Sequence, residues 1–371
     1  MRILLLSCNT GGGHNSAATA IRAHFSERGI DCDIRDALLF VSKAHTEILS
    51  KGHFFMYRHL PQLFGVGYRF EEKHPPRFLY KQMALGAKRF AAFLHENAYD
   101  AIICTHIFGN MLVTEARRKC GITLPHYVVT TDYAMHPGTD MVDASRYFVA
   151  AEQVRLSLID AGIPADRIIA SGIPVSPDFL RSFDQLAVRR QLGLPEKGKT
   201  VLLFSGSIGC GKLNRIAPEL VRRLPADCNL AVLCGHNKRM YKLLQDHIGP
   251  RITVVGYTTR VAEYMAAADL CITKPGGLST TEMLAIGLPM VLMLSVPGCE
   301  TRNLQFFKNL GVAVGTNDWN EAIQLTVDLI NDEEQLTEMR ERLLAVGYPG
   351  GAKVIADTVM ADIGAGEHTD D

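Results

Sequence analysis

Several glycine-rich segments of this 371-residue chain carry side chains suited to binding phosphate or moving a proton. The densest is Lys274–Glu282, with the sequence Lys-Pro-Gly-Gly-Leu-Ser-Thr-Thr-Glu. Its proline and paired glycines indicate a sharp turn, and Ser279 or Thr280 is placed to cap a helix whose free N–H groups favour phosphate. Glu282 is placed to accept hydrogen bonds from vicinal hydroxyls such as those of ribose, or alternatively only to bond backbone N–H groups. The candidates for binding in this segment are Lys274, Pro275, Gly276, Gly277, Ser279, Thr280 and Glu282.

A second glycine-rich segment has the spacing of a phosphate-binding loop from Gly206 to Lys212. The next residue is Leu213, where coordination of Mg²⁺ requires Ser or Thr. The segment therefore predicts an anion-binding loop without a metal ligand, with an ordinary strand-to-helix turn as the alternative. Its candidate residues are Gly206, Ser207 and Gly209.

Two further segments carry candidate binding residues. Gly256 and Tyr257 follow an apolar run, and such a loop could pack against a nucleobase or be an ordinary loop. Glu300 and Asn303 are one helical turn apart, so both could face one ligand. A carboxylate beside an amide suits a polyhydroxyl group such as a sugar.

Near the N-terminus, Thr10–Ser16 reads Thr-Gly-Gly-Gly-His-Asn-Ser. Glycines including Gly12 and Gly13 would let the backbone turn tightly, and Asn15 or Ser16 would cap the following helix. His14 at this position could act as a general base near neutral pH, or could be a capping or surface residue.

The segment Thr130–Pro137 supplies two more polar candidates after an apolar run. Asp132 could orient or activate a base, and His136 could contact phosphate or an acceptor hydroxyl. Both residues could equally have a structural role. No histidine spacing typical of zinc is present, so no metal site is predicted.

The strongest electrostatic feature is Lys51–Arg89, in which eight basic residues face only two acidic ones, Glu71 and Glu72. Aromatic residues alternate with these cations. Such a composition is typical of a solvated face or of a segment that meets an anionic membrane.

Composition bounds the class of protein. Lys+Arg and Asp+Glu both number 39, and this neutral balance argues against a nucleic-acid binder. The nine cysteines show no CxxC spacing and indicate reduced thiols in the cytoplasm. No apolar run approaches the ~20 residues that span a bilayer.

Short apolar runs that alternate with helical patterns must position these loops. The pattern predicts an α/β protein with two doubly wound parallel sheets, and ligands at the carboxyl ends of the strands. We expect domains at 1–178 and 200–350, a linker at 179–199, and a C-terminal helix and frayed tail at 351–371. The expected strands are Arg2–Ser7, Cys32–Arg35, Ala101–Thr105, His126–Thr130, Arg146–Val149 and Ile168–Ala170, then Thr200–Phe204, Asn229–Cys234, Arg251–Val255, Leu270–Thr273, Pro289–Leu294 and Val312–Val314.

Five motifs in this order resemble the diacylglycerol glycosyltransferase family, which includes monogalactosyldiacylglycerol synthases and processive diacylglycerol glucosyltransferases. They are Gly-Gly-Gly-His ending at His14, the TDxxxHP pattern at Thr131–Pro137, Gly-Ile-Pro-Val at Gly172–Val175, Lys274–Glu282, and Pro297–Asn303. Two positions depart from the family pattern: Cys299 stands where Gln is usual, and no Trp follows His136 nearby.

The resemblance implies a GT-B fold, two Rossmann-like domains facing each other across a cleft, and an inverting transfer of a hexose that gives a β-glycoside. It implies UDP-glucose or UDP-galactose as donor and diacylglycerol or a related lipid as acceptor, without a cofactor. It assigns His14 as the base with Asp132 in support, Glu282 to ribose, and Glu300 and Asn303 to the sugar. It places the protein in the cytoplasm, on the inner face of the cell membrane. The alternatives are a UDP-sugar 2-epimerase, a transferase acting on a polyprenyl-linked or other acceptor, and a nucleotide-sugar sensor.

Overall fold

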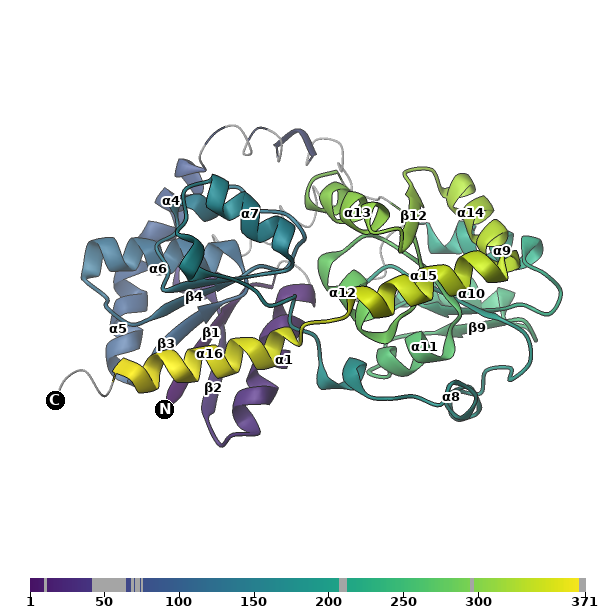
Figure 1. The fold of residues 1–371 in the computed structure, drawn as a ribbon, viewed down its shortest axis with the longest axis horizontal. Coiled ribbons are helices and arrows are strands. Elements are labelled where there is room, and N and C mark those ends of the chain that lie inside the picture. The colour runs from purple at the N-terminus through teal and green to yellow at the C-terminus, as the bar shows by residue number, and fades with distance from the viewer. Residues whose placement is uncertain are drawn as a thin grey trace. The chain divides into compact units, whose positions relative to one another are not determined.

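The computed structural model describes residues 1–9, 12–41, 65–67, 70, 74, 76–206, 212–293 and 297–366. The chain divides into two compact units. The first comprises Met1–Ser176 and Pro349–Asp371, and the second comprises Pro177–Tyr348. The second unit is therefore an insertion between the body of the first unit and its last helix (Figure 1).

The first unit is built on a six-stranded parallel sheet in the order β2-β1-β3-β4-β5-β6. Residues Ile3–Leu6 of β1 are fully buried, because helices cover both faces of the sheet. Each such side chain stabilises the fold by about 1.5–3 kcal/mol relative to an exposed one. The strands are β1 Arg2–Ser7, β2 Asp31–Asp36, β3 Ala101–Cys104, β4 His126–Val129, β5 Arg146–Val149 and β6 Ile168–Ala170.

Helices cover this sheet between successive strands, as expected for parallel connections. His106 caps α6, since its Nδ1 accepts a hydrogen bond from the Phe108 N–H at 3.1 Å. The helices are α1 Gly12–Ser26, α4 Arg77–Met83, α5 Ala87–Asn97, α6 Ile107–Cys120 and α7 Glu152–Asp160, with short 3₁₀ turns that include η1 Ala37–Phe40, η2 Ala84–Gly86, η3 Thr139–Met141 and η4 Ala165–Arg167.

The last helix, α16 Gly351–Gly366, packs on α1 of the first unit (Figure 1). Its Ile355 and Val359 are fully buried in the same core as Phe25. Asp362 accepts two hydrogen bonds from Arg146, each 2.7 Å long. The segment expected as a separate C-terminal element is thus part of the first unit, and residues 367–371 of the expected tail lie outside the described residues.

The second unit contains another six-stranded parallel sheet, in the order β12-β11-β10-β7-β8-β9. Its strands are β7 Thr200–Phe204, β8 Asn229–Leu233, β9 Ile252–Val255, β10 Leu270–Thr273, β11 Met290–Met293 and β12 Ala313–Thr316. Its helices are α8 Gln185–Leu192, α9 Leu213–Arg223, α10 Lys238–Leu244, α11 Val261–Ala267, α12 Gly277–Ile286, α13 Cys299–Asn309, α14 Trp319–Asn331 and α15 Glu333–Val346, with the 3₁₀ turns η5 Pro177–Leu180 and η6 Gln245–His247. All the strands predicted from the sequence are present, and their ends differ from the expected ones by at most two residues. The doubly wound α/β fold is confirmed.

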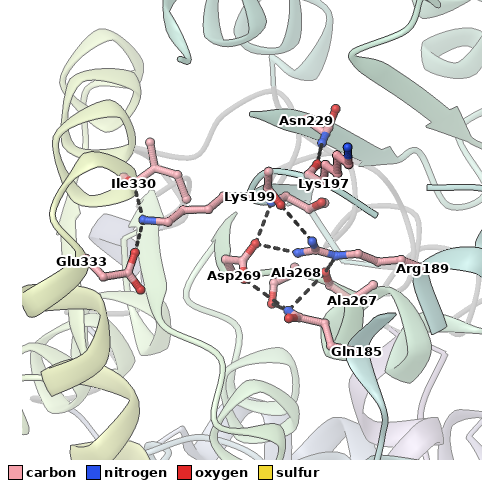
Figure 2. Close-up of polar contacts among 12 residues, drawn as sticks. Gln185, Arg189, Lys197, Lys199, Asn229, Ala267, Ala268, Asp269, Ile330 and Glu333 are labelled. Carbon is pink, nitrogen blue, oxygen red and sulfur yellow. Dashed lines mark hydrogen bonds and ion pairs between the residues drawn. The ribbon is translucent and has the colours of Figure 1, made fainter. Parts of the chain in front are cut away.

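The segment 179–199, expected as a linker, is anchored in the second unit. Figure 2 shows Gln185 and Arg189 of α8 directed at the Ala267–Asp269 backbone and the Asp269 carboxylate. The buried Arg189 guanidinium donates to the Ala267 carbonyl at 2.8 Å and to Asp269 Oδ2 at 2.7 Å. A buried ion pair holds well only where further hydrogen bonds satisfy it, and Asp269 Oδ2 also accepts from the Thr200 N–H at 2.7 Å.

Candidate active site

The sheet of each unit has a topological switch point, and several of the polar residues predicted from the sequence lie in the loops around it. In the second unit the chain leaves β7 toward β8 and β9 on one side, then returns to β10 on the other. In the first unit the switch point lies between β1 and β3. The loops that leave two such neighbouring strands diverge, which exposes their backbone groups to a ligand.

Around the second unit's switch point, three segments of the chain lie close to the side chain of Lys274. Lys274 Nζ lies 2.5 Å from Glu300 Oε1, at the start of α13. A Cβ at Gly206 would lie 3.4 Å from Lys274 Cε, and a Cβ at Gly276 would lie 3.4 Å from Lys274 Nζ. The loop after β7, the loop after β10 and the start of α13 thus place these predicted donor-binding residues side by side.

The turn after β10 is stabilised by a hydrogen bond from the side chain of Asn303. Its side chain is fully buried, and Nδ2 donates to the Pro275 carbonyl at 3.0 Å. Asn303 therefore fixes the shape of the glycine turn, a role that the sequence did not suggest. Whether it also contacts a sugar stays a prediction.

The first turn of α12 offers N–H groups without a side-chain cap within the described part of the chain. The helix begins at Gly277 with Gly276 as its N-cap residue. The expected cap, Ser279 or Thr280, is wrong, because both residues lie inside the helix and Thr280 Oγ1 bonds back to the Gly276 carbonyl at 3.0 Å. Thr281 does the same toward Gly277 at 2.7 Å. A glycine cap leaves the positive end of the helix dipole accessible to an anion.

Glu282 lies on α12, one turn from this helix start. Burial raises the pKa of its carboxyl to about 8. At neutral pH the group is therefore largely protonated, so it can donate one hydrogen bond and accept others.

An exposed pair of rings extends the site along the same sheet edge. The side chain of Tyr257 after β9 is 60% exposed, and its ring stacks on His236, which follows β8. The ring centroids are 4.1 Å apart and the planes differ by 20°. Gly256 has room for a Cβ, with nothing closer than 3.8 Å. The sequence analysis missed His236, although it follows a predicted strand as the other candidates do.

Two candidates of the loop after β7, Ser207 and Gly209, lie outside the described residues. Gly206 is described and adopts φ +64°, a conformation that glycine tolerates without strain.

In the first unit, Gly12 and Gly13 form the start of α1 instead of a turn before it. The expected cap, Asn15 or Ser16, is wrong because the helix has already begun at Gly12. The Asn15 side chain instead ties the helix to the end of β1, where Ser7 Oγ donates to Asn15 Oδ1 at 2.5 Å.

His14 meets two threonines that the sequence analysis did not name as site residues, although Thr131 begins the TDxxxHP motif. Its Nδ1 lies 2.8 Å from the Thr105 carbonyl oxygen and 3.0 Å from Thr131 Oγ1. A carbonyl only accepts, so the neutral ring carries its proton on Nδ1 and its lone pair on Nε2. Burial lowers the pKa of His14, and the Thr105 carbonyl offsets part of this effect. His14 is therefore a neutral imidazole with a basic Nε2 at physiological pH.

Three more residues of the first unit lie at this edge of the sheet, namely His106, Asp132 and His136. The His106 ring packs edge-to-face on His14, with centroids 4.4 Å apart. Asp132 follows Thr131 in the loop after β4, and in the same loop His136 Nδ1 lies 2.9 Å from the Pro137 carbonyl. The loops after β1, β3 and β4 therefore meet at His14.

Comparison with known proteins agrees with these motifs. Residues 14–175 match the family model of monogalactosyldiacylglycerol (MGDG) synthase, and residues 200–345 match the glycosyltransferase family 28 C-terminal domain. The chain belongs to the diacylglycerol glycosyltransferase family. A processive diacylglycerol beta-glucosyltransferase of Bacillus cytotoxicus is 28% identical over 369 residues, covering 97% of this chain and 94% of the relative. The enzyme of the same name from Bacillus cereus strain AH820 is 28% identical over 372 residues with the same coverage.

Solved structures show the fold of this family member to be GT-B. MurG of Acinetobacter baumannii matches with a TM-score of 0.65 and 17% identity, over 97% of this chain and 99% of MurG. A UDP-GlcNAc 2-epimerase from Neisseria meningitidis matches with a TM-score of 0.62 and 13% identity, over 97% and 100% of the two chains. Because both kinds of enzyme share the fold, the choice between them rests on the family models and the sequence relatives, which favour a glycosyltransferase.

Within the described part of this glycosyltransferase, no group of three or more His, Cys, Asp or Glu side chains could hold a metal ion. Among the same residues, no helix has both the length and the apolar character needed to cross a bilayer. The absence of a cofactor stays a prediction.

The raised pKa of Glu282 has a testable consequence for stability. In an unfolded chain a glutamate has a pKa of about 4.3. Between that pH and about 8, Glu282 therefore binds more protons in the folded protein than in the unfolded chain. The free energy of unfolding of the second unit should therefore fall as the pH rises through this range, by at most about 1.4 kcal/mol per pH unit from this residue. We expect Glu282→Gln to flatten this slope in urea unfolding at pH 5 and pH 8. The same substitution at the exposed Glu338 should leave the slope unchanged, and equal slopes in wild type and Glu282→Gln would contradict the assignment.

Proposed function

We propose that this protein is an inverting glycosyltransferase that moves a hexose from UDP-glucose or UDP-galactose to diacylglycerol or a related lipid, giving a β-glycosyl glycolipid. The observation that carries the proposal is the similarity to processive diacylglycerol beta-glucosyltransferases over 97% of the chain. The arrangement of polar groups at the two switch points supports it.

The second unit is suited to hold the donor. The open N-terminus of α12 and the Lys274 ammonium would bind the diphosphate, which carries the charge that develops as UDP leaves. Glu282 would bind the ribose hydroxyls, and the exposed ring of Tyr257 would pack on the base. Glu300 and Asn303 would contact the sugar from α13.

The first unit is suited to activate the acceptor. In the proposed step, His14 Nε2 takes the proton of the acceptor hydroxyl while that oxygen attacks the anomeric carbon of the sugar. The bond from the anomeric carbon to the diphosphate oxygen breaks, and its electron pair leaves with UDP. A single displacement of this kind inverts the anomeric configuration. Because Nδ1 carries the resting proton, the resulting imidazolium holds one proton on each nitrogen.

The experiment that tests this function uses three donors: UDP-glucose, UDP-galactose and UDP-GlcNAc, each with and without diacylglycerol vesicles. A transferase releases UDP and forms glycolipid only when lipid is present. An epimerase would convert UDP-GlcNAc without lipid, and a sensor would bind the donor without turnover. UDP release that is independent of lipid would contradict the proposal.

Removing the base should abolish transfer while sparing donor binding. We expect His14→Ala to lower kcat by about 10²–10⁴-fold, the range for loss of a general base, with UDP affinity changed less than about twofold. His24→Ala on the same helix is the matched control and should keep wild-type activity. Activity of His14→Ala within a few fold of the wild type would refute this role, as measured by transfer of radiolabelled hexose.

We further propose that the first unit docks on an anionic membrane, as a peripheral protein on the inner face of the cell membrane. Most of the basic segment Lys51–Arg89, residues 51–64, 68, 69, 71–73 and 75, lies outside the described residues. Its C-terminal part is the continuous helical run α4-η2-α5.

One side of this run combines exposed apolar residues with cations. Phe78 is 69% exposed and Leu85 is 62% exposed, and their spacing puts both on one helical face. Arg89 reaches the Leu39 carbonyl at 3.4 Å, which adds the half-exposed Leu39 of η1 to this surface. Four cations and no acidic residue occur between positions 76 and 95, namely Arg77, Lys81, Lys88 and Arg89. Positive charge around projecting apolar side chains suits an anionic lipid surface.

Neutralising two of these cations should weaken membrane binding. At about 1 kcal/mol per cation, Lys81→Gln with Lys88→Gln should lower affinity for vesicles containing anionic lipid by about 30-fold. The matched control is Arg239→Gln with Lys242→Gln, two exposed cations on α10 of the second unit. Co-sedimentation with vesicles measures both. Equal losses in the two double variants, or none in either, would contradict the proposed docking face.

A further inference from the structure

The residues that hold the His14 ring follow two strands, β3 and β4, that lie far from His14 in the sequence. Thr105 follows β3 and is 1% exposed. Thr105 makes two contacts with His14. Its carbonyl oxygen lies 2.8 Å from His14 Nδ1, and its Oγ1 donates to the His14 carbonyl at 3.1 Å. The Thr105 N–H in turn donates to the Leu6 carbonyl of β1 at 3.0 Å. The ring is therefore oriented by the hydrogen-bond ladder between β1 and β3.

Thr131 supplies the second contact to the same nitrogen. Its Oγ1 lies 3.0 Å from Nδ1, in the loop after β4. A hydroxyl oxygen can share the Nδ1 proton with the Thr105 carbonyl, because a hydroxyl keeps two acceptor lone pairs. Two oxygen atoms that can accept the Nδ1 proton thus lie beside Nδ1, on the Thr105 carbonyl and on the Thr131 hydroxyl.

The His106 ring limits rotation of His14 about its side chain. It packs edge-to-face on His14, and its own Nδ1 is occupied by the Phe108 N–H at 3.1 Å. A flipped His14 would place Cδ2 where Nδ1 now faces the Thr105 carbonyl, and would lose the hydrogen bond.

We propose that Thr105 and Thr131 are the positioning residues of the base: they hold the proton on Nδ1 of His14 and so present the lone pair of Nε2 to the acceptor hydroxyl. The inference rests on the proposed function. When Nε2 takes up a proton, both oxygens stabilise the imidazolium through Nδ1–H. The base is therefore supported by a backbone carbonyl and a hydroxyl, which are neutral groups.

The test compares Thr131→Val, which removes the hydroxyl at nearly constant volume, with Thr131→Ser, which retains it. We expect Thr131→Val to lower kcat about tenfold with KM for the UDP-sugar within twofold, because the hydroxyl acts on the base and not on the donor. Loss of an acceptor from the imidazolium should also move the acid limb of the pH profile to lower pH. Thr131→Ser should restore both values.

Thr114→Val is the matched control, since Thr114 Oγ1 bonds only a helix carbonyl of α6, that of Asn110 at 2.8 Å, among its described contacts. It should leave kcat and the pH profile unchanged. An unchanged kcat and pH profile in Thr131→Val, or equal losses in Thr131→Val and Thr114→Val, would overturn the proposal.

A second readout does not depend on activity. Nitrogen-15 spectra of labelled histidine in the full chain, assigned with His14→Ala, report which ring nitrogen carries the proton. We expect the Nδ1–H form in the wild type and a mixture of tautomers in Thr131→Val. A wild type with the proton on Nε2 would overturn the proposal even if transfer is observed. A wild type with the Nδ1–H form but no transfer with any donor would refute the proposed function and leave this geometry standing.

Discussion

The switch point of a parallel sheet is the constraint on which the rest of this structure depends. Where the chain leaves one strand in one direction and its neighbour in the other, no connecting helix covers the carboxyl ends between them. Both units have candidate site residues around such a switch point. In the first unit the strand ends fix His14 through the Thr105 carbonyl, and in the second they gather Gly206, Lys274 and Gly276.

The two sites differ in their electrostatics in a way that suits their proposed roles. The first unit places neutral acceptors beside a partly buried histidine, so that the ring stays uncharged until it takes a proton. The second unit holds a cation, Lys274, paired with Glu300 beside an uncapped helix start. A diphosphate there would compete with Glu300 for the ammonium, and a largely protonated Glu282 adds little opposing charge.

The sequence was sufficient to predict both sheets, because fully buried parallel strands read as continuous apolar runs between helical patterns. It also located Lys274 directly after a strand, and His14 and Glu282 near the starts of the helices that follow strands. It was insufficient where the deciding contact joins distant segments. Nothing local marks Thr105 or Thr131 as partners of His14, since they lie 91 and 117 residues away.

Two other differences between prediction and structure have local causes. Asp184 is the N-cap and Gly193 the C-cap residue of α8. This pair is a local signal of a helix within the segment expected as a linker. The caps of α1 and α12 were misplaced because glycine can start a helix without offering a side chain, and so leaves no signature. That property is what keeps the first turn of α12 open.

The most direct test of the account is hydrogen–deuterium exchange of the full chain with and without UDP. We expect UDP to give its strongest protection to amides at the start of α12, in peptides covering Gly276–Glu282, and to those around Tyr257. Protection confined to the start of α1, around His14, with none at Gly276–Glu282, would contradict it.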